Sequence, residues 1–114
     1  MDFEMFQGNS KNIVISVYDK PNGNRVPLVG ADSMKWQLFS ESLEAPEAII
    51  SKDLSTGITI FQDAVGDYMQ VALAATDTAN MLGRYYYETE VTDSSGNKET
   101  VDTGWITIKK KRIA

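Results

Sequence analysis

The residues that could do chemistry in this chain are carboxylates, because its 114 residues include neither histidine nor cysteine. General acid–base catalysis would fall to carboxylates, and the candidates are Asp63, Asp67, Asp77 and Asp102. A glycosidase needs two carboxyls that face each other across a cleft, an arrangement that sequence spacing alone does not reveal. Aspartate is also common in turns and at helix starts, where it binds backbone amides. We therefore expect no catalytic residue and no enzymatic activity.

Metal and phosphate sites are indicated equally weakly. The lack of cysteine and histidine excludes disulfides, thiol nucleophiles and zinc sites built on these residues. The stretches "DKPNGN" and "DAVGD" place oxygen ligands near glycine, but neither matches the calcium loop with its terminal glutamate. The glycines show no phosphate-loop spacing. We expect no cofactor and no defining metal site, with a loosely bound calcium ion as an open alternative.

The charge balance argues against nucleic acid as a partner. The chain has 16 acidic and 11 basic residues and a net charge of −5, whereas proteins that track phosphates are basic. Part of the basic charge is the run 109–112 in the tail 109–114. Binding of an anionic partner is one interpretation of this run, but we favour lysines that solvate the end of the last strand and discourage edge pairing. No apolar run approaches the ~20 residues of a membrane-spanning helix. The opening "MDFEMFQGNS" lacks the basic start of a signal peptide, so we expect neither a membrane partner nor a signal peptide.

The elements that must position these side chains are strands. Apolar and polar residues alternate along short segments, and turn signals such as "KPNGN", "QDAVGD" and "TDSSGNK" separate them. The stretch "ATDTANML" is the one segment that fits a helical turn. This pattern predicts an all-β fold, an antiparallel β-sandwich of about seven to nine strands, with 1–114 as a single domain. The expected strands lie at 3–7, 12–19, 33–40, 48–52, 57–61, 67–74, 84–91 and 99–110.

The stretch "GRYYYETEV" sorts its three tyrosines by face. Alternate side chains of a strand share a face, so Tyr85 and Tyr87 are predicted to point one way and Tyr86 the other, with Arg84 and two glutamates. Charged neighbours mark the second face as solvated, which predicts that Tyr85 and Tyr87 point inward. A tyrosine that enters the core just after a turn is typical of the tyrosine corner of immunoglobulin-like sandwiches. Trp36 suits the buried central tryptophan of such folds.

Aromatic residues on outward faces are the remaining candidates for a binding surface. They are Tyr18, Phe39, Tyr86 and Trp105, which is predicted to face outward because Ile106 and Ile108 look buried. A bulge at Gly104 would change that register. If these aromatics cluster, the patch would be an interface with protein or glycan. We favour protein, because a sheet offers a flat surface.

A series of short motifs runs along nearly the whole chain. They are "VPLVGA" at 26–31, "MKWQLF" at 34–39, "DT" at 77–78, "LGRY" at 82–85, "DSSG" at 93–96 and "GWITI" at 104–108. This order resembles the small immunoglobulin-like domains of phage and prophage structural proteins, such as the N-terminal domains of baseplate upper proteins and related tail accessory proteins. The motifs are structural, so no functional residue carries over from the resemblance.

The resemblance implies a non-catalytic virion structural or assembly protein that makes protein–protein contacts in a tail, baseplate, neck or capsid. The implied partners are phage structural subunits or further copies of the chain. The implied location is a virion component assembled in the bacterial cytoplasm. The alternative, which rests on the exposed aromatics, is a carbohydrate- or ligand-binding β-sandwich module.

Overall fold

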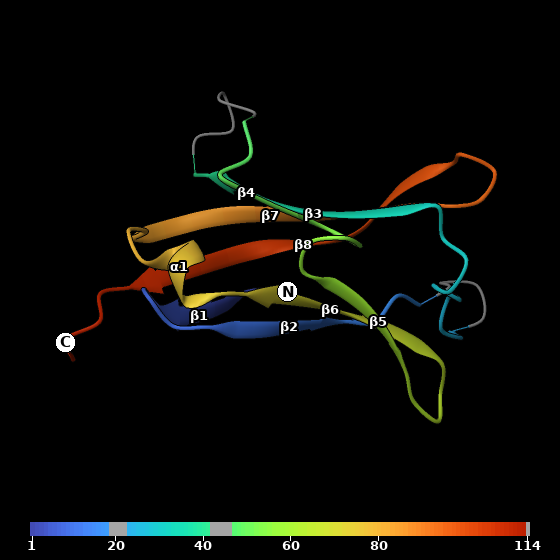
Figure 1. Ribbon diagram of the computed structural model, residues 1–114, viewed down its shortest axis with the longest axis horizontal. Coiled ribbons are helices and arrows are strands. Elements are labelled where there is room, and N and C mark those ends of the chain that lie inside the picture. The colour runs from blue at the N-terminus through green and yellow to red at the C-terminus, as the bar shows by residue number, and fades with distance from the viewer. Residues whose placement is uncertain (19–22, 42–46, 114) are drawn as a thin grey trace.

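The computed structural model describes residues 1–18, 23–41 and 47–113, and within these ranges the protein is a sandwich of two β-sheets. The all-β prediction is confirmed, as is a single helical turn within "ATDTANML". In Figure 1 the sheets lie one above the other, with β3 and β7 in the upper layer and β2, β5 and β6 in the lower. The elements are β1 (Phe3–Phe6), β2 (Lys11–Ile15), β3 (Ser33–Ser40), β4 (Ile50–Asp53), β5 (Ile58–Gln62), β6 (Asp67–Leu73), α1 (Ala75–Thr78), β7 (Gly83–Thr92) and β8 (Lys98–Lys109).

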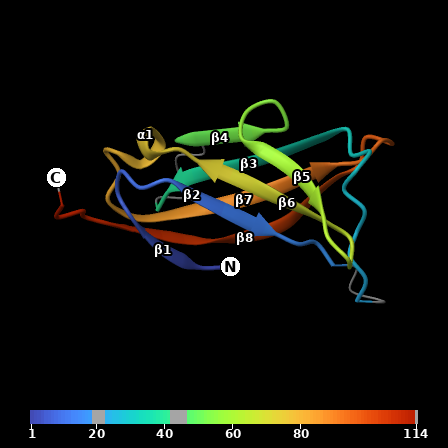
Figure 2. The ribbon, with the colours of Figure 1, turned by 60° about the horizontal axis from the view of Figure 1, so that its bottom comes forward.

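The strand order is immunoglobulin-like. One sheet has the order β1-β8-β7-β3-β4 and the other has the order β2-β6-β5. The three-stranded sheet corresponds to strands B, E and D of an immunoglobulin domain, and β3, β7 and β8 correspond to C, F and G. The strand β1 pairs with β8 in parallel, and the remaining pairs of the described strands are antiparallel. Figure 2 shows β2, β6 and β5 crossing in front of the larger sheet.

The core follows from the two-residue alternation of these strands. Every strand contributes at least one buried apolar side chain to one cluster between the sheets. Trp36 and Tyr87 are fully buried at its centre, with stacked rings whose centroids lie 5.6 Å apart. Tyr85 is half-buried at the margin, and its hydroxyl donates a hydrogen bond of 3.0 Å to the carbonyl of Leu82. The inward direction of both tyrosines and the tyrosine corner are therefore confirmed.

The pairing of β7 with β8 decides whether a bulge lies at Gly104. The register shifts between Thr89 and Glu90, which pair with Asp102 and Thr100, so the bulge is not at Gly104. Gly104 pairs regularly with Tyr87. Glycine is required there for a different reason, because a Cβ would collide with the backbone of Met1. The N-terminal residue therefore lies directly on β8.

The predicted turns are described in part. The hairpin between β7 and β8 is confirmed, since the amide of Asn97 and the amide of Ser95 both bind the Asp93 carboxylate. Gly96 in this turn has a φ of 86°, which favours glycine. The predicted "KPNGN" turn and the irregular segment around Pro46 fall largely on 19–22 and 42–46, outside the described residues. In the basic tail, residues 110–113 follow β8 as exposed chain without a strand.

Candidate functional site

Three of the four predicted interface aromatics form one row on the outer face of the five-stranded sheet. Phe39 pairs with Tyr86 in the register of β3 and β7, and Tyr86 pairs with Trp105 in the register of β7 and β8. The ring centroids of Tyr86 and Trp105 lie 5.3 Å apart. We call Phe39, Tyr86 and Trp105 the aromatic row. Strand pairing brings together residues that are far apart in the sequence.

The aromatic row is partly covered by a cation. The guanidinium carbon of Arg84 lies 4.3 Å from the centroid of the Trp105 ring, a close cation–π contact. All three aromatic side chains of the row are half-buried, whereas Arg84 itself is exposed. The planes of the Tyr86 and Trp105 rings meet at 57°. One ring of the row, that of Trp105, therefore lies under a guanidinium, and the rings of Tyr86 and Trp105 are not coplanar.

Charged side chains continue this outer face along the strands. Glu88 and Glu90 follow Tyr86 outward along β7, and Lys35 on β3 pairs in register with Glu90. Gln37 donates a hydrogen bond of 3.3 Å to the hydroxyl of Ser51 on the neighbouring strand. The aromatic row thus borders a solvated surface that carries both signs of charge.

Tyr18 lies apart from the aromatic row. It follows the end of β2, in the part of the chain that leads away from the three-stranded sheet, and 55% of its surface is exposed. It forms an isolated β-bridge with Arg25, whose guanidinium carbon lies 5.9 Å from the Tyr18 ring centroid. The alternation that identified Tyr18 as outward-facing gave no information about which outer surface it would reach.

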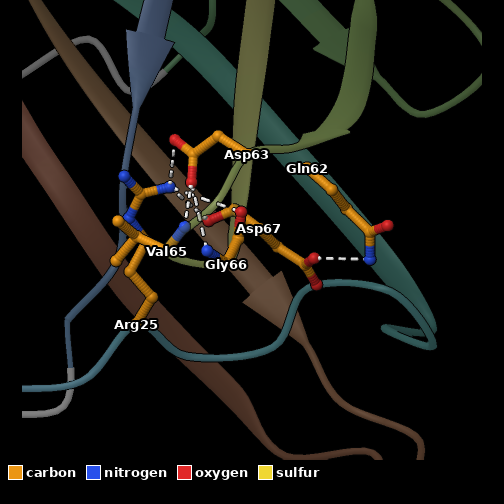
Figure 3. Close-up of polar contacts among 6 residues, drawn as sticks. All are labelled: Arg25, Gln62, Asp63, Val65, Gly66 and Asp67. Carbon is orange, nitrogen blue, oxygen red and sulfur yellow. Dashed lines mark hydrogen bonds and ion pairs between the residues drawn. The ribbon is translucent and has the colours of Figure 1, made fainter.

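Two of the candidate acids, Asp63 and Asp67, lie at the same turn, between β5 and β6. Figure 3 shows that their carboxylates have separate partners, with Arg25 beside Asp63 and Gln62 beside Asp67. Asp63 accepts hydrogen bonds from the amides of Val65 and Gly66 and lies 2.9 Å from Arg25. The Val65 amide and Arg25 hold the pKa of Asp63 below its ordinary value. Aspartate in a turn commonly accepts hydrogen bonds from nearby backbone amides in this way.

Asp67 is buried and anchors a distant segment. Its carboxylate accepts hydrogen bonds of 2.7 Å and 3.0 Å from the amides of Leu28 and Val29, and a third from Gln62. The amides of Val29 and Leu28 hold the pKa of Asp67 below its ordinary value. The sequence identified Asp67 as a turn residue, but it gave no sign of this contact because Leu28 is 39 residues away.

The other two candidate acids also have structural partners. Asp77 accepts a hydrogen bond of 2.7 Å from the amide of Ala74 at the start of α1 and pairs with Lys52 at 2.9 Å. Asp102 accepts a hydrogen bond of 2.7 Å from the hydroxyl of Tyr87. Burial, together with Asp102, raises the pKa of Tyr87 well above its ordinary value. Across the described ranges no three acidic side chains gather in a way that could hold a metal ion.

A groove of about 910 Å³ opens at the end of the sandwich where the β7–β8 hairpin meets the segment before β3. Its lining mixes apolar side chains with polar ones; examples are Val26, Val29, Val101, Asp93, Asn97 and Lys98. Sequence reasoning did not identify this groove, because its two walls are far apart in the chain.

None of the helices in the described part of the chain is long and apolar enough to cross a membrane.

Comparison with known proteins adds little to this geometry. No protein-family model and no curated protein matches the chain. Among solved structures, murine CRIg is 16% identical, with a TM-score of 0.39 over 97% of this chain and 92% of that one. AggA, the major subunit of aggregative adherence fimbriae type I from Escherichia coli, is 12% identical, with a TM-score of 0.38 over 95% and 89%. With TM-scores this low, neither likeness bears on function, and the fold assignment rests on the strand order.

Proposed function

We propose that the protein is a non-catalytic structural or assembly protein of a phage or prophage particle, which makes protein–protein contacts in a tail, baseplate, neck or capsid. The observation that carries the contact function is the aromatic row, in which Phe39, Tyr86 and Trp105 align across three strands of one outer face. The assignment to a phage or prophage particle rests on the resemblance of the chain's motifs to phage immunoglobulin-like domains.

The chemistry of the aromatic row suits a protein partner. Tyrosine, tryptophan and arginine are the residues most enriched at the energetic centres of protein interfaces, and Tyr86, Trp105 and Arg84 lie together here. A sugar-binding platform needs an open ring face on which a pyranose can stack. Arg84 lies over the Trp105 ring and Tyr86 is tilted from it by 57°, so this geometry supports protein over carbohydrate.

The acidic side chains support a role without catalysis. Asp67 accepts hydrogen bonds from the amides of Leu28 and Val29, and Asp102 accepts one from the Tyr87 hydroxyl. Asp63 stabilises a turn and Asp77 stabilises the start of a helix. A general acid or base must be able to reach a substrate proton. Under this proposal the partner is a structural subunit, with no nucleic acid and no membrane, and assembly takes place in the bacterial cytoplasm.

The test is co-purification with particles. A tagged copy of the chain is expressed in the bacterium that carries the gene, the prophage is induced, and the particles are banded in a density gradient. We expect the wild-type chain in the particle band and a Tyr86→Ala/Trp105→Ala chain in the soluble fraction. Lys35→Ala, on the same outer face, is the control and should stay with the particles.

Two outcomes would overturn the proposal. One is a wild-type chain that never enters the particle band although particles form. The other is binding on a glycan array that disappears with Tyr86→Ala, which would favour the carbohydrate-binding alternative. Circular dichroism of the purified variants must show the wild-type strand signal, so that loss of binding is separated from loss of fold.

A further inference from the structure

Two charged side chains flank Tyr86 on β7 at equal distances. Arg84 lies two residues before it and Glu88 two residues after it, so all three share the outer face of the five-stranded sheet. At about 3.3 Å per residue, each of the two lies about 7 Å from Tyr86 along the strand. Within the described ranges neither Arg84 nor Glu88 takes part in an ion pair. The aromatic row therefore lies between one positive and one negative charge that no described neighbour pairs.

Other charged side chains of this outer face lie beside opposite charges. Lys35 is the cross-strand neighbour of both Glu90 and Asp53, and Lys109 forms an ion pair of 2.7 Å with Glu4. Positive and negative side chains thus nearly balance here, although the whole chain has a net charge of −5. Charges more than about 8 Å away are largely screened at physiological ionic strength. The local balance therefore matters more for a contact on this face than the net charge does.

The order of the two flanking charges fits a second copy of the chain. A two-fold contact brings the same patch of both copies together. If the two-fold axis lies in the interface, at right angles to β7 and beside Tyr86, the strands of the two copies run in opposite directions, and Arg84 of each copy faces Glu88 of the other. If the axis runs along β7, Arg84 faces Arg84, and like charges oppose the contact. We propose that the partner on the aromatic row is a second copy of this chain, packed face to face with antiparallel strands and joined by two Arg84–Glu88 ion pairs.

This inference rests on the contact function proposed for the aromatic row and names the partner. In the antiparallel arrangement Tyr86 and Trp105 meet their own copies near the two-fold axis, and aromatic rings with arginine are typical of interface centres. Charges that leave water favour association only when they are paired, and this arrangement pairs both flanking charges. The inference does not depend on the phage assignment.

The outer face is large enough for a specific contact. The strands β1 and β4 have four residues each, β3 has eight, β7 has ten and β8 has twelve. At about 4.8 Å between strands and about 3.3 Å along them, they cover roughly 600 Å² on each copy, or roughly 1,200 Å² in total. Specific protein interfaces begin at about this size. Figure 1 shows β3 and β7 in the layer that faces away from the three-stranded sheet. We expect a Kd on the order of 10 µM.

Exchange of the two charges tests the inference. The full chain is studied by sedimentation equilibrium from about 1 µM to about 1 mM, a range that brackets the expected Kd. Arg84→Glu and Glu88→Arg each place like charges opposite each other at two points of the contact, and we expect each to weaken the dimer by at least about tenfold. Both residues are exposed, and circular dichroism must show the wild-type strand signal in every variant.

The matched control is the double variant Arg84→Glu/Glu88→Arg, which has the net charge and the composition of the wild type. It restores both ion pairs with the charges exchanged, so we expect it to form a dimer at least about fivefold stronger than either single variant. Net repulsion alone predicts another pattern. Arg84→Glu makes the chain more negative and Glu88→Arg makes it less negative, so the two single variants would have opposite effects.

Weakening in both single variants with recovery in the double variant would support the inference. Opposite effects of the two single variants would overturn it, as would a double variant no stronger than the single ones. A wild-type chain that stays monomeric up to about 1 mM but enters the particle band would also overturn it and assign the aromatic row to a different subunit. A dimer that passes the charge exchange but never enters the particle band would support the second copy and overturn the proposed function instead.

Discussion

The two outer surfaces of the sandwich differ in the number of charged side chains that they present. The five-stranded sheet presents Lys35, Arg84, Glu88 and Glu90 to solvent around the aromatic row. The three-stranded sheet presents none, and its one acid, Asp67, is buried on the inner side. Both sheets follow the same two-residue alternation. Alternation therefore decides which side chains point outward. The charges on an outer face decide how costly it is to remove that face from water.

The inner faces differ as well. The five-stranded sheet places the stacked pair Trp36 and Tyr87 in the core. The three-stranded sheet contributes aliphatic side chains and methionine; they are Ile13, Ile15, Ile58, Met69, Val71 and Leu73. Large rings bury more apolar area per residue and leave larger cavities when removed. The stability of the fold should therefore be more sensitive to substitution on the inner face of the larger sheet.

The largest expected effect comes from removing the buried tryptophan. Trp36→Ala takes away a fully buried ring that stacks on Tyr87, and we expect a loss of about 3–5 kcal/mol in the free energy of unfolding. Ile13→Ala on the three-stranded sheet is the matched truncation to alanine, and it should cost less, at the lower end of about 2–5 kcal/mol. Urea denaturation followed by circular dichroism measures both. Equal losses would contradict the difference between the two inner faces.

A smaller effect is expected where the N-terminal segment rests on the larger sheet. Gly104→Ala directs a methyl group into the backbone of Met1, so the segment must move, and we expect a loss of about 1–3 kcal/mol. Movement of this segment also breaks the hydrogen bond of 2.6 Å from the Met1 amino group to the Thr103 carbonyl. Thr103→Ala, one residue away and exposed, is the control and should change stability by less than about 0.5 kcal/mol. Amide hydrogen exchange in β1 should rise in Gly104→Ala alone.

The sequence was sufficient for the sandwich and for the direction of most core side chains. Alternation placed Trp36, Tyr85 and Tyr87 inward, because a strand with one buried face must repeat every two residues. The turn residues of "DSSGN" marked the β7–β8 hairpin, since Asp93 binds backbone amides locally. These features depend on neighbours in the chain, so a single sequence can reveal them.

The sequence was not sufficient for features that depend on strand pairing. It could not show that Arg84 covers Trp105, because these residues lie on neighbouring strands. It did not show that Tyr18 and Phe39 lie on different surfaces, since alternation predicts that a side chain points outward but not from which sheet. The absence of charge from the outer side of β2, β5 and β6 was hidden for the same reason. The strands β2, β5 and β6 lack outward charges individually, but only the strand order joins them into one surface.

The buried acid of the three-stranded sheet should have a specific pH dependence. The pKa of Asp67 is lowered in the folded state by the amides of Val29 and Leu28, so the unfolded chain binds this proton first as the pH falls. The stability that Asp67 contributes is therefore present above the ordinary aspartate pKa, and it is lost as the pH falls below about 5 and on through the lowered folded pKa. Asp67→Asn should be less stable than wild type at neutral pH, and the difference should shrink in acid.

Thermal unfolding of both proteins across this pH range measures the effect. Other aspartates with a lowered pKa, such as Asp53 and Asp93, are present in both proteins and cancel in the difference. A difference in stability that stays constant from neutral pH to acid would mean that Asp67 does not hold its charge through these amides.

The smallest expected effect tests whether a cation is what distinguishes the two outer faces. Arg84→Ala removes the guanidinium above the Trp105 ring, and an exposed cation–π contact contributes about 0.5–1 kcal/mol. The informative measurement is the accessibility of tryptophan fluorescence to acrylamide. Trp36 is fully buried, so a change in quenching reports on Trp105. We expect stronger quenching in Arg84→Ala.

Lys35→Ala is the matched control for this measurement, because Lys35 lies on the same outer face and takes part in none of the cation–ring contacts of the described residues. It removes one positive charge, as Arg84→Ala does, without uncovering a ring. If both variants were quenched to the same degree as wild type, Arg84 would not shield Trp105, and the aromatic row would be as open as the stacked pair Phe61 and Tyr68. The preference for a protein over a carbohydrate partner on the aromatic row would then lose its physical basis.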